Sequence, residues 1–270
     1  MACAPSLSPS RKEVSIGNME VGVYGLGRFG SFWASLLAQR FSVKGYTRSG
    51  QRAAPPGVTL AGEDEVLSCD ALFLAVSISA MEQVVGRIAS RIPGRTVVFD
   101  TCSVKLYPIS VMKRILPKEV RIVGTHPMFG PDSGRNGVSG LPIVYCPVRV
   151  DEATAAEWRS HFLTMGLRVS DLSPEEHDRE VAYTQGVTHF VGRVLNDLGL
   201  KPSAISTVGY AKLLEIIEQT CNDPWQLFLD LQRYNPYTTE MRVALYTSLT
   251  KIKERLESSL ESDAGSGAPP

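Results

Sequence analysis

Excess charge of either sign is missing from this sequence, and so are long hydrophobic runs. Lys and Arg number 28, Asp and Glu also number 28, and the formal net charge is +0. Without a positive excess, the chain is not expected to bind nucleic acid through bulk electrostatics. No apolar run approaches the ~18 residues that a membrane span needs, so no membrane partner is predicted.

Cysteine and histidine are also scarce. The five cysteines are scattered and form no C-x-x-C pair, which favours reduced, mostly buried thiols in a cytoplasmic protein over disulfides or a zinc site. We therefore expect no metal centre. The Ser- and Pro-rich residues 1–18 and the Ser-, Gly- and Ala-rich residues 258–270 are predicted to be a disordered leader and a disordered tail. The cysteines are Cys3, Cys69, Cys102, Cys146 and Cys221.

One motif organises the first half of the chain. Residues 21–24 predict a short buried strand, residues 25–30 spell G-x-G-x-x-G, and an apolar helical pattern follows through Leu37. In a dinucleotide site these glycines allow a tight turn, close approach of the pyrophosphate and helix–strand packing, and the helix N-terminus offers free N–H groups to the phosphates. The alternative is a tight strand–helix turn that binds nothing. The predicted cofactor contacts are Gly25, Leu26, Gly27, Arg28, Phe29 and Gly30.

Strand and helix patterns alternate up to residue 172, which is typical of a parallel, doubly wound α/β sheet. After Ser173, a predicted N-cap, only helical patterns follow. We therefore expect a dinucleotide-binding domain over 19–172 and an all-α domain over 173–257. A helical domain of this size has a large surface for its volume, so it is predicted to form a homodimer. The further predicted strands are 41–47, 58–60, 71–76, 96–100, 120–124, 141–150 and 167–170. The predicted helices are 81–92, 152–165, 177–199, 203–220, 224–233 and 238–257.

The cofactor is predicted to be NADP. NAD-selective sites carry an Asp or Glu about 20 residues after the glycines, where it binds the ribose 2′-hydroxyl. Here that region reads Thr47-Arg48-Ser49 and contains no acid. A carboxylate would repel the 2′-phosphate of NADP, whereas Arg48 attracts it and the two hydroxyls can donate to it. Ser77, after the strand predicted over 71–76, completes the predicted cofactor contacts.

Two polar clusters, over 100–105 and 124–131, follow neighbouring predicted strands. Ligands of open α/β sheets bind at the carboxyl ends of strands, so Ser103 and His126 are expected to lie near each other and near the nicotinamide. A histidine between a buried strand and a Gly/Pro-rich loop is a poor choice for core packing. Its ordinary pKa of about 6.5 suits it to accept a proton at neutral pH. The alternatives are a structural histidine at 126 and a helix cap at 103.

Polar residues also interrupt an apolar helix in the second half. Gln185, Thr188 and His189 are spaced i, i+3 and i+4 and so share one face. They predict either a lined pocket or a buried contact with a second copy, and we assign Gln185 and Thr188 to substrate binding. His177, at the start of the helical region, belongs either to a helix-start network or to the site.

Together these segments resemble the plant branch of the prephenate/arogenate dehydrogenase family of tyrosine biosynthesis. The resemblance covers residues 19–257 and rests on segments 25–30, 100–105, 125–131, 176–179 and 222–225. It implies a Rossmann domain, a helical dimerisation domain and NAD(P)-dependent oxidative decarboxylation of a cyclohexadienol. By resemblance, His126 polarises or deprotonates the 4-hydroxyl of the substrate, and Ser103 helps to position that hydroxyl and His126.

The choice between prephenate and arogenate is predicted from charge. Arogenate carries an ammonium where prephenate has a keto group, and a carboxylate that faces this ammonium would repel the side-chain carboxylate of prephenate. The plant family is expected to carry an acid at or beside position 222, where this chain has Asn222 followed by Asp223. With Asn222 as the selecting substrate contact, the prediction is prephenate, as in the shorter legume-type enzymes. With Asp223 selecting, it is arogenate. Candidate cations for the substrate carboxylates are Lys105, Arg135 and Arg233.

Two rival functions are weighed against this one. A β-hydroxyacid dehydrogenase shares the two-domain plan but needs a lysine on a helix of the second domain, and residues 185–200 contain none. A non-catalytic NADP sensor needs neither Ser103 nor His126, and turnover of any cyclohexadienol would exclude it.

Overall fold

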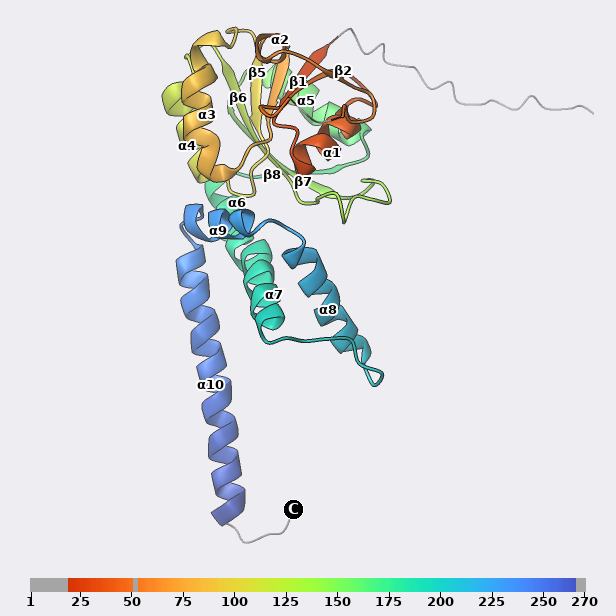
Figure 1. The fold of residues 1–270 in the computed structure, drawn as a ribbon. Coiled ribbons are helices and arrows are strands. Elements are labelled where there is room, and N and C mark those ends of the chain that lie inside the picture. Colours follow the sequence, from red (N-terminus) through yellow and green to blue (C-terminus); the bar gives the residue numbers. More distant parts are fainter. Residues whose placement is uncertain (1–18, 51–52, 266–270) are drawn as a thin grey trace, which may run out of the picture.

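A computed structural model of the protein describes residues 19–50 and 53–265. The predicted leader lies outside the described residues, as do residues 266–270 of the predicted tail. Figure 1 shows two regions: a sheet flanked by helices, and a group of helices below it from which one long helix projects. This is the predicted Rossmann-type α/β domain followed by an all-α region.

A single sheet holds the first region, with its strands in the order β3-β2-β1-β4-β5-β6-β7-β8. The eight predicted strands are all present. Their bounds are β1 (Glu20–Tyr24), β2 (Ser42–Tyr46), β3 (Val58–Leu60), β4 (Ala71–Leu74), β5 (Val97–Asp100), β6 (Arg121–Pro127), β7 (Pro142–Arg149) and β8 (Arg168–Asp171).

The prediction of a parallel sheet is wrong at one pair. β7 runs antiparallel to β6, with Thr125 opposite Tyr145, whereas the other neighbouring strands are parallel. The chain between β6 and β7 contains no helix. Without a crossover helix, it turns back beside the strand that it has just left instead of returning to the start of a parallel one. β6 ends at Pro127, so His126 lies next to the carboxyl end of that strand.

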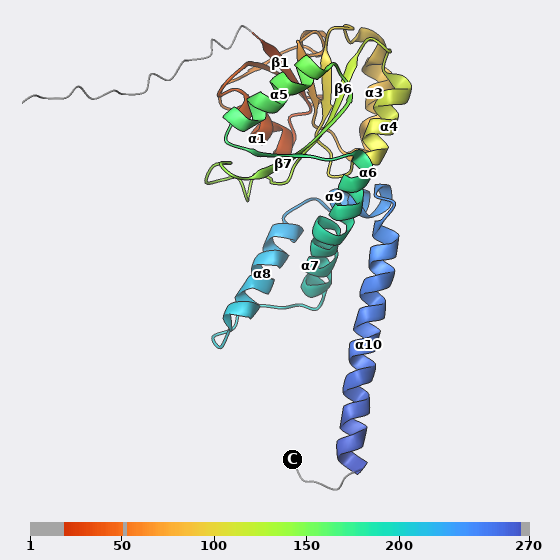
Figure 2. The ribbon, with the colours of Figure 1, turned by 180° about the vertical axis from the view of Figure 1, so that it is seen from behind.

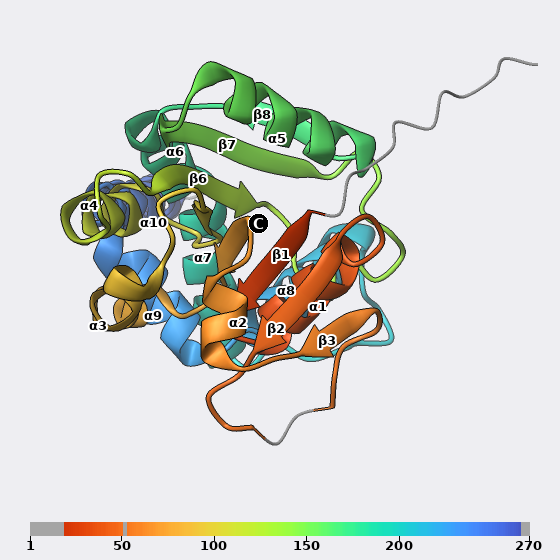
Figure 3. The ribbon, with the colours of Figure 1, turned by 90° about the horizontal axis from the view of Figure 1, so that it is seen from above.

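Helices cover both faces of the sheet and enclose two hydrophobic cores, and the view from above shows them around it (Figure 3). On one face, α1 and α5 bury an aromatic cluster that includes Trp33, Phe73, Phe99 and Trp158. On the other face lie α2, α3 and α4, and no bounds were predicted for α2 and α4. The elements are α1 (Arg28–Leu37), α2 (Glu63–Leu67), η1 (Ile78–Ala80), α3 (Met81–Ile88), η2 (Ala89–Arg91), α4 (Leu106–Ile115) and α5 (Glu152–Thr164).

The helical region differs from its prediction in two places. The first helix begins at Pro174, capped by the side chain of Ser173, and it contains a wide π-helical turn at η3 in place of a continuous helix over 177–199. The helix predicted from 203 begins only at Val208, with Thr207 as its N-cap. The elements are α6 (Pro174–Val181), η3 (Ala182–Gly186), α7 (Val187–Asp197), α8 (Val208–Cys221), α9 (Trp225–Tyr234) and α10 (Thr238–Gly265).

The last helix also corrects the prediction of a disordered tail from residue 258, since α10 continues to Gly265. Leu256 and Leu260 extend its apolar stripe, and Lys253 pairs with Glu257 one turn on, which supports helix in this segment. Figures 1 and 2 both show α10 projecting away from the sheet. None of the described helices is long and apolar enough to cross a membrane.

A buried ion pair fixes the carboxyl edge of the sheet, where the two polar clusters meet. The side chains of Lys105 and Asp100 are fully buried and bonded to each other. Lys105 Nζ also donates to the carbonyl of Thr125 at 2.6 Å, and Asp100 Oδ1 accepts the backbone N–H of Cys102 at 3.0 Å. The pair thus connects the end of β5 to the end of β6.

Removing one partner should therefore destabilise the fold. We expect Lys105→Met to lower the free energy of unfolding by about 3–5 kcal/mol, because it leaves the Asp100 carboxylate buried without a cation. Urea denaturation measures this change. The double variant Lys105→Met/Asp100→Asn should lose less than the sum of the two single variants, and additive losses would contradict the coupling.

Candidate active site

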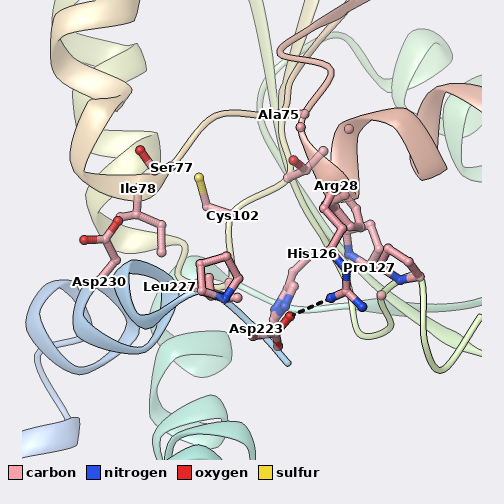
Figure 4. Close-up of a pocket in the computed structure, with 18 of the residues that line it drawn as sticks. Arg28, Ala75, Ser77, Ile78, Cys102, His126, Pro127, Asp223, Leu227 and Asp230 are labelled. Atoms are coloured by element: carbon pink, nitrogen blue, oxygen red, sulfur yellow. Dashed lines mark hydrogen bonds and ion pairs between the residues drawn. The ribbon is translucent and has the colours of Figure 1, made fainter. Parts of the chain in front are cut away.

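A cavity of about 340 Å³ lies at the carboxyl edge of the sheet, between the α/β region and the helical region. Four segments from the sheet side contribute to it, and η3, α7 and the α8–α9 corner close the other side. Figure 4 shows how these residues converge from separate elements. The sheet-side segments are residues 27–30, 75–78, 101–103, 126–131 and 133.

The glycine loop between β1 and α1 has the shape of a phosphate cradle. Gly25 has a φ of +105°, and a Cβ there would collide with the carbonyl of Ala75. A Cβ on Gly30 would collide with the carbonyl of Gly25, so the helix packs directly on the loop. Gly27 faces open space and caps α1 without any side-chain hydrogen bond. The first N–H groups of α1 are therefore available to an anion, and the residues fit a dinucleotide pyrophosphate.

The predicted cofactor residues fall into three groups. Gly27, Arg28, Phe29, Gly30 and Ser77 line the cavity. The Leu26 side chain is buried in the core, so only the backbone of this residue is available to a cofactor at the glycine loop. Thr47, Arg48 and Ser49 follow β2 beside β1, and Arg48 and Ser49 are exposed. Two hydroxyls lie 3.3 Å apart there, those of Thr47 and Ser49.

His126 is held by a chain of hydrogen bonds that the sequence did not reveal. His126 Nδ1 lies 2.8 Å from His177 Nε2, and His177 Nδ1 lies 2.7 Å from Asp178 Oδ1. Asp178 also accepts the backbone N–H groups of Lys105 (2.6 Å) and Leu106 (3.0 Å) at the start of α4. This carboxylate accepts only, so the His177 Nδ1–H donates to it. His177 Nε2 then accepts from the His126 Nδ1–H, and His126 Nε2 keeps its lone pair.

Burial keeps both histidines uncharged. It is the largest cause that lowers the pKa of His126 well below its ordinary value, and the nearby His177 and Lys105 lower it further. Burial, and to a smaller extent the positive charge of Lys105, lowers the pKa of His177 to about 2. Since His126 also lines the cavity, the structure presents a neutral imidazole nitrogen with a free lone pair to a ligand at neutral pH.

Three further polar atoms in the cavity wall have no protein partner. They are Ser103 Oγ, Gln185 Oε1 and His189 Nδ1, and all three are buried. Buried polar groups are normally hydrogen-bonded, so these three unpaired atoms indicate that a polar ligand supplies their hydrogen-bond partners. Burial, and to a smaller extent the positive charge of Arg193, lowers the pKa of His189 to about 4, so this side chain is also neutral.

Several predicted substrate residues lie elsewhere. Thr188 does not line the cavity, and its hydroxyl donates to the carbonyl of Thr184, whereas Gln185, in the wide turn at η3, and His189 do line it. Asn222 lines a neighbouring hollow, whereas the next residue, Asp223, lines the cavity itself.

The candidate cations for substrate carboxylates are not part of the cavity wall either. Lys105 is fully buried against Asp100, Arg135 lines the neighbouring hollow, and Arg233 lies over the ring of Tyr234. Among the residues that line the cavity in the described chain, Arg28 is the one Lys or Arg. From the sequence, Arg28 was predicted to contact the cofactor only.

Comparison with known proteins agrees with this geometry. Residues 41–163 match the family model described as the nucleotide-binding domain of prephenate dehydrogenase, and residues 194–267 match a TYRAAT1-like C-terminal domain. Chloroplastic arogenate dehydrogenase 2 of Arabidopsis thaliana is 34% identical over 250 residues, which cover 88% of this chain and 70% of the relative. Chloroplastic arogenate dehydrogenase 1 of the same plant is 33% identical over 256 residues, which cover 90% of this chain and 40% of the relative.

Solved structures show the same fold. Prephenate dehydrogenase from A. aeolicus, in complex with hydroxyphenyl propionate and NAD+, superposes with a TM-score of 0.71 at 18% identity. The match covers 92% of this chain and 94% of that structure. At this identity the likeness concerns the fold alone.

The hydrogen-bond chain makes a prediction about the tautomer of His126. In ¹⁵N-resolved NMR spectra we expect His126 to carry its proton on Nδ1 and to stay neutral as the pH falls below 6.5, because its pKa is depressed. Asp178→Asn should weaken this preference, since an amide cannot accept from all three of its donors. The exposed Glu175, three residues before Asp178, offers a control. Glu175→Gln should leave the tautomer of His126 unchanged. A His126 protonated mainly on Nε2 would refute the arrangement.

Proposed function

The chain belongs to the prephenate and arogenate dehydrogenase family, and on that premise we propose that it catalyses the NADP-dependent oxidative decarboxylation of prephenate to 4-hydroxyphenylpyruvate in tyrosine biosynthesis. The resemblance in the sequence motifs is thereby confirmed at the level of the family. The observation that carries the proposal is the neutral His126, backed by His177 and Asp178 and facing the same cavity as the glycine loop.

The reaction needs a base beside a bound hydroxyl. A nicotinamide cofactor held by the glycine loop would supply the acceptor for the hydride from the ring carbon that carries the 4-hydroxyl. His126 Nε2 takes the proton of that hydroxyl, while Ser103 Oγ, an unpaired atom in the same wall, orients it. As the bond from the opposite ring carbon to its carboxylate breaks, the electron pair enters the ring and CO₂ leaves. The proton then returns from His126 to the phenolic oxygen, so no net proton is consumed.

The preference for NADP rests on the residues after β2. Arg48 is exposed there, between two hydroxyl side chains, and Thr47-Arg48-Ser49 contains no carboxylate that would repel a 2′-phosphate. The strand register places Tyr46 opposite Tyr24, directly before the glycine loop, so this segment lies at the same edge as the phosphate cradle.

The preference for prephenate rests on charge. Residue 222 is uncharged, and Asp223, one of the two carboxylates that line the cavity, is paired with Arg28 at 3.3 Å. A paired carboxylate attracts an ammonium less and repels a second carboxylate less than a free one.

Arogenate is the second candidate, and two observations favour it. The two Arabidopsis relatives are arogenate dehydrogenases. Asp223, and not Asn222, lies in the cavity wall.

Steady-state assays with both substrates and both cofactors distinguish these candidates. We expect a higher kcat/KM for prephenate with NADP, followed through the absorbance of NADPH. Asn222→Asp should move the ratio of kcat/KM values toward arogenate by about tenfold or more, since it adds a negative charge beside Asp132 and Asp223.

The exposed Asn196 provides a matched control, because Asn196→Asp adds the same charge far along α7 and should leave the ratio unchanged. A native preference for arogenate would refute the substrate proposal and leave the family intact. If neither substrate reacted, a non-catalytic NADP sensor would become the better account.

We also propose that a second copy of the chain covers the projecting helix. Apolar side chains on α10 recur every three or four residues and are more than half exposed, whereas isolated apolar stripes of this length are rare on monomers. The stripe consists of Tyr246, Leu249, Ile252, Leu256 and Leu260.

Light scattering coupled to gel filtration tests this homodimer. Leu249→Glu/Leu256→Glu should convert the dimer into monomer, because each change buries a charge in the apolar contact. Ser258→Glu, on the opposite side of the helix, should leave the dimer intact. A native monomer at micromolar concentration would overturn the proposal.

A further inference from the structure

Arg28 joins three segments of the chain at the cavity. Its backbone belongs to the start of α1, and its guanidinium is turned toward two carboxylates. Nη2 lies 2.6 Å from Asp132 Oδ1, in the loop after β6, and Nη1 lies 3.3 Å from Asp223 Oδ1, at the α8–α9 corner. Figure 4 shows the Arg28–Asp223 pair close to His126 and Pro127.

Asp223 is held firmly in this position. Its backbone carbonyl accepts from Arg193 Nη2 at 2.7 Å, and the guanidinium of Arg193 stacks on Trp225 at 5.1 Å. Its carboxylate is 28% exposed. Burial raises the pKa of this carboxyl and Arg28 acts against that effect, so the ionised form depends on its partner. Asp223 therefore presents a charge to the cavity that Arg28 largely cancels.

Asp132 connects the neighbouring hollow to the same arginine. Asn222 lines that hollow with Asp132, and the hydrogen bond between their side chains helps Arg28 to hold the pKa of Asp132 below its ordinary value. Residues 222 and 223, the two candidates for substrate selection, thus approach Arg28 from two sides, one through Asp132 and one directly.

We propose that Arg28 is a specificity-determining residue, which masks the Asp223 carboxylate and thereby favours substrates with a keto side chain over those with an ammonium. This inference rests on the proposed function. An ammonium that approached Asp223 would have to displace the guanidinium and would meet its positive charge. A keto acid meets no such repulsion, and its carboxylates are attracted by the one arginine in the cavity wall of the described chain.

Removing the arginine charge tests the mask. In Arg28→Gln we expect the ratio of kcat/KM for arogenate to kcat/KM for prephenate to rise by about tenfold or more. Arg28 also belongs to the cofactor loop, so both substrates are measured at saturating NADP, where a change in cofactor affinity cancels from the ratio. Arg28→Lys keeps the charge and should keep the ratio within about twofold of the native value.

Two further variants identify the carboxylate that is unmasked. Asp223→Asn in the Arg28→Gln background should cancel the rise, because no free charge is left to attract the ammonium. In the same Arg28→Gln background, Asp132→Asn removes the other partner of Arg28, which lies outside the cavity wall. This variant should keep the raised ratio of kcat/KM values. Asp230 is the other carboxylate in the wall; it accepts from Ser79 and Gln226. A rise that survived Asp223→Asn would assign the effect to Asp230 and overturn the proposal.

A binding measurement separates this inference from the proposed function. Calorimetry with tyrosine and with 4-hydroxyphenylpyruvate compares an ammonium with a keto group without any turnover. If the native protein reacted with neither substrate but Arg28→Gln gained tyrosine affinity relative to the keto acid, the proposed function would fail and the mask would stand. If Arg28→Gln changed both affinities and both kcat/KM values equally, Arg28 would serve the cofactor alone.

Discussion

The ion pair between Lys105 and Asp100 is the constraint on which the site depends. The Lys105 side chain holds the carbonyl of Thr125, directly before His126, and its backbone N–H donates to Asp178. Asp178 holds His177, which in turn holds His126. His126, the proposed base, is therefore fixed from two directions by one residue. If Lys105 moved, the end of β6 and the hydrogen-bond chain behind the imidazole would both lose their support.

The same residue also affects the protonation of the base. The positive charge of Lys105 adds to burial in lowering the pKa values of His126 and His177. A buried ion pair that served only for rigidity could be replaced as a whole by apolar packing with little loss of stability. A cation beneath two histidines has a second effect that apolar packing would not reproduce, because it disfavours the imidazolium and keeps the lone pair of His126 available.

Sequence patterns predicted the parts of the molecule that depend on neighbouring residues. The glycine loop, the eight strands and the cap at Ser173 follow from local conformation and periodicity, and Ser103 and His126 follow from their positions at strand ends. The contacts of His177 and Asp178 with the ends of β6 and α4 cross more than fifty residues of chain, so no local pattern encodes them. The wide turn at η3 has the same character. It interrupts the regular helical spacing from which a shared face was predicted, and Gln185 lines the cavity while Thr188 does not.

Charge in the cavity shows why a list of acids does not determine substrate choice. The sequence places Asn222 and Asp223 side by side, and either residue alone suggests a different substrate. In the folded chain their side chains reach different hollows, yet both are connected to Arg28, which comes from a motif assigned to the cofactor. The potential that a substrate meets depends on this pairing and not on the acid itself. If Arg28 acts as proposed, a family that shares one fold has two ways to change its substrate, because it can alter the partner of a carboxylate as well as the carboxylate.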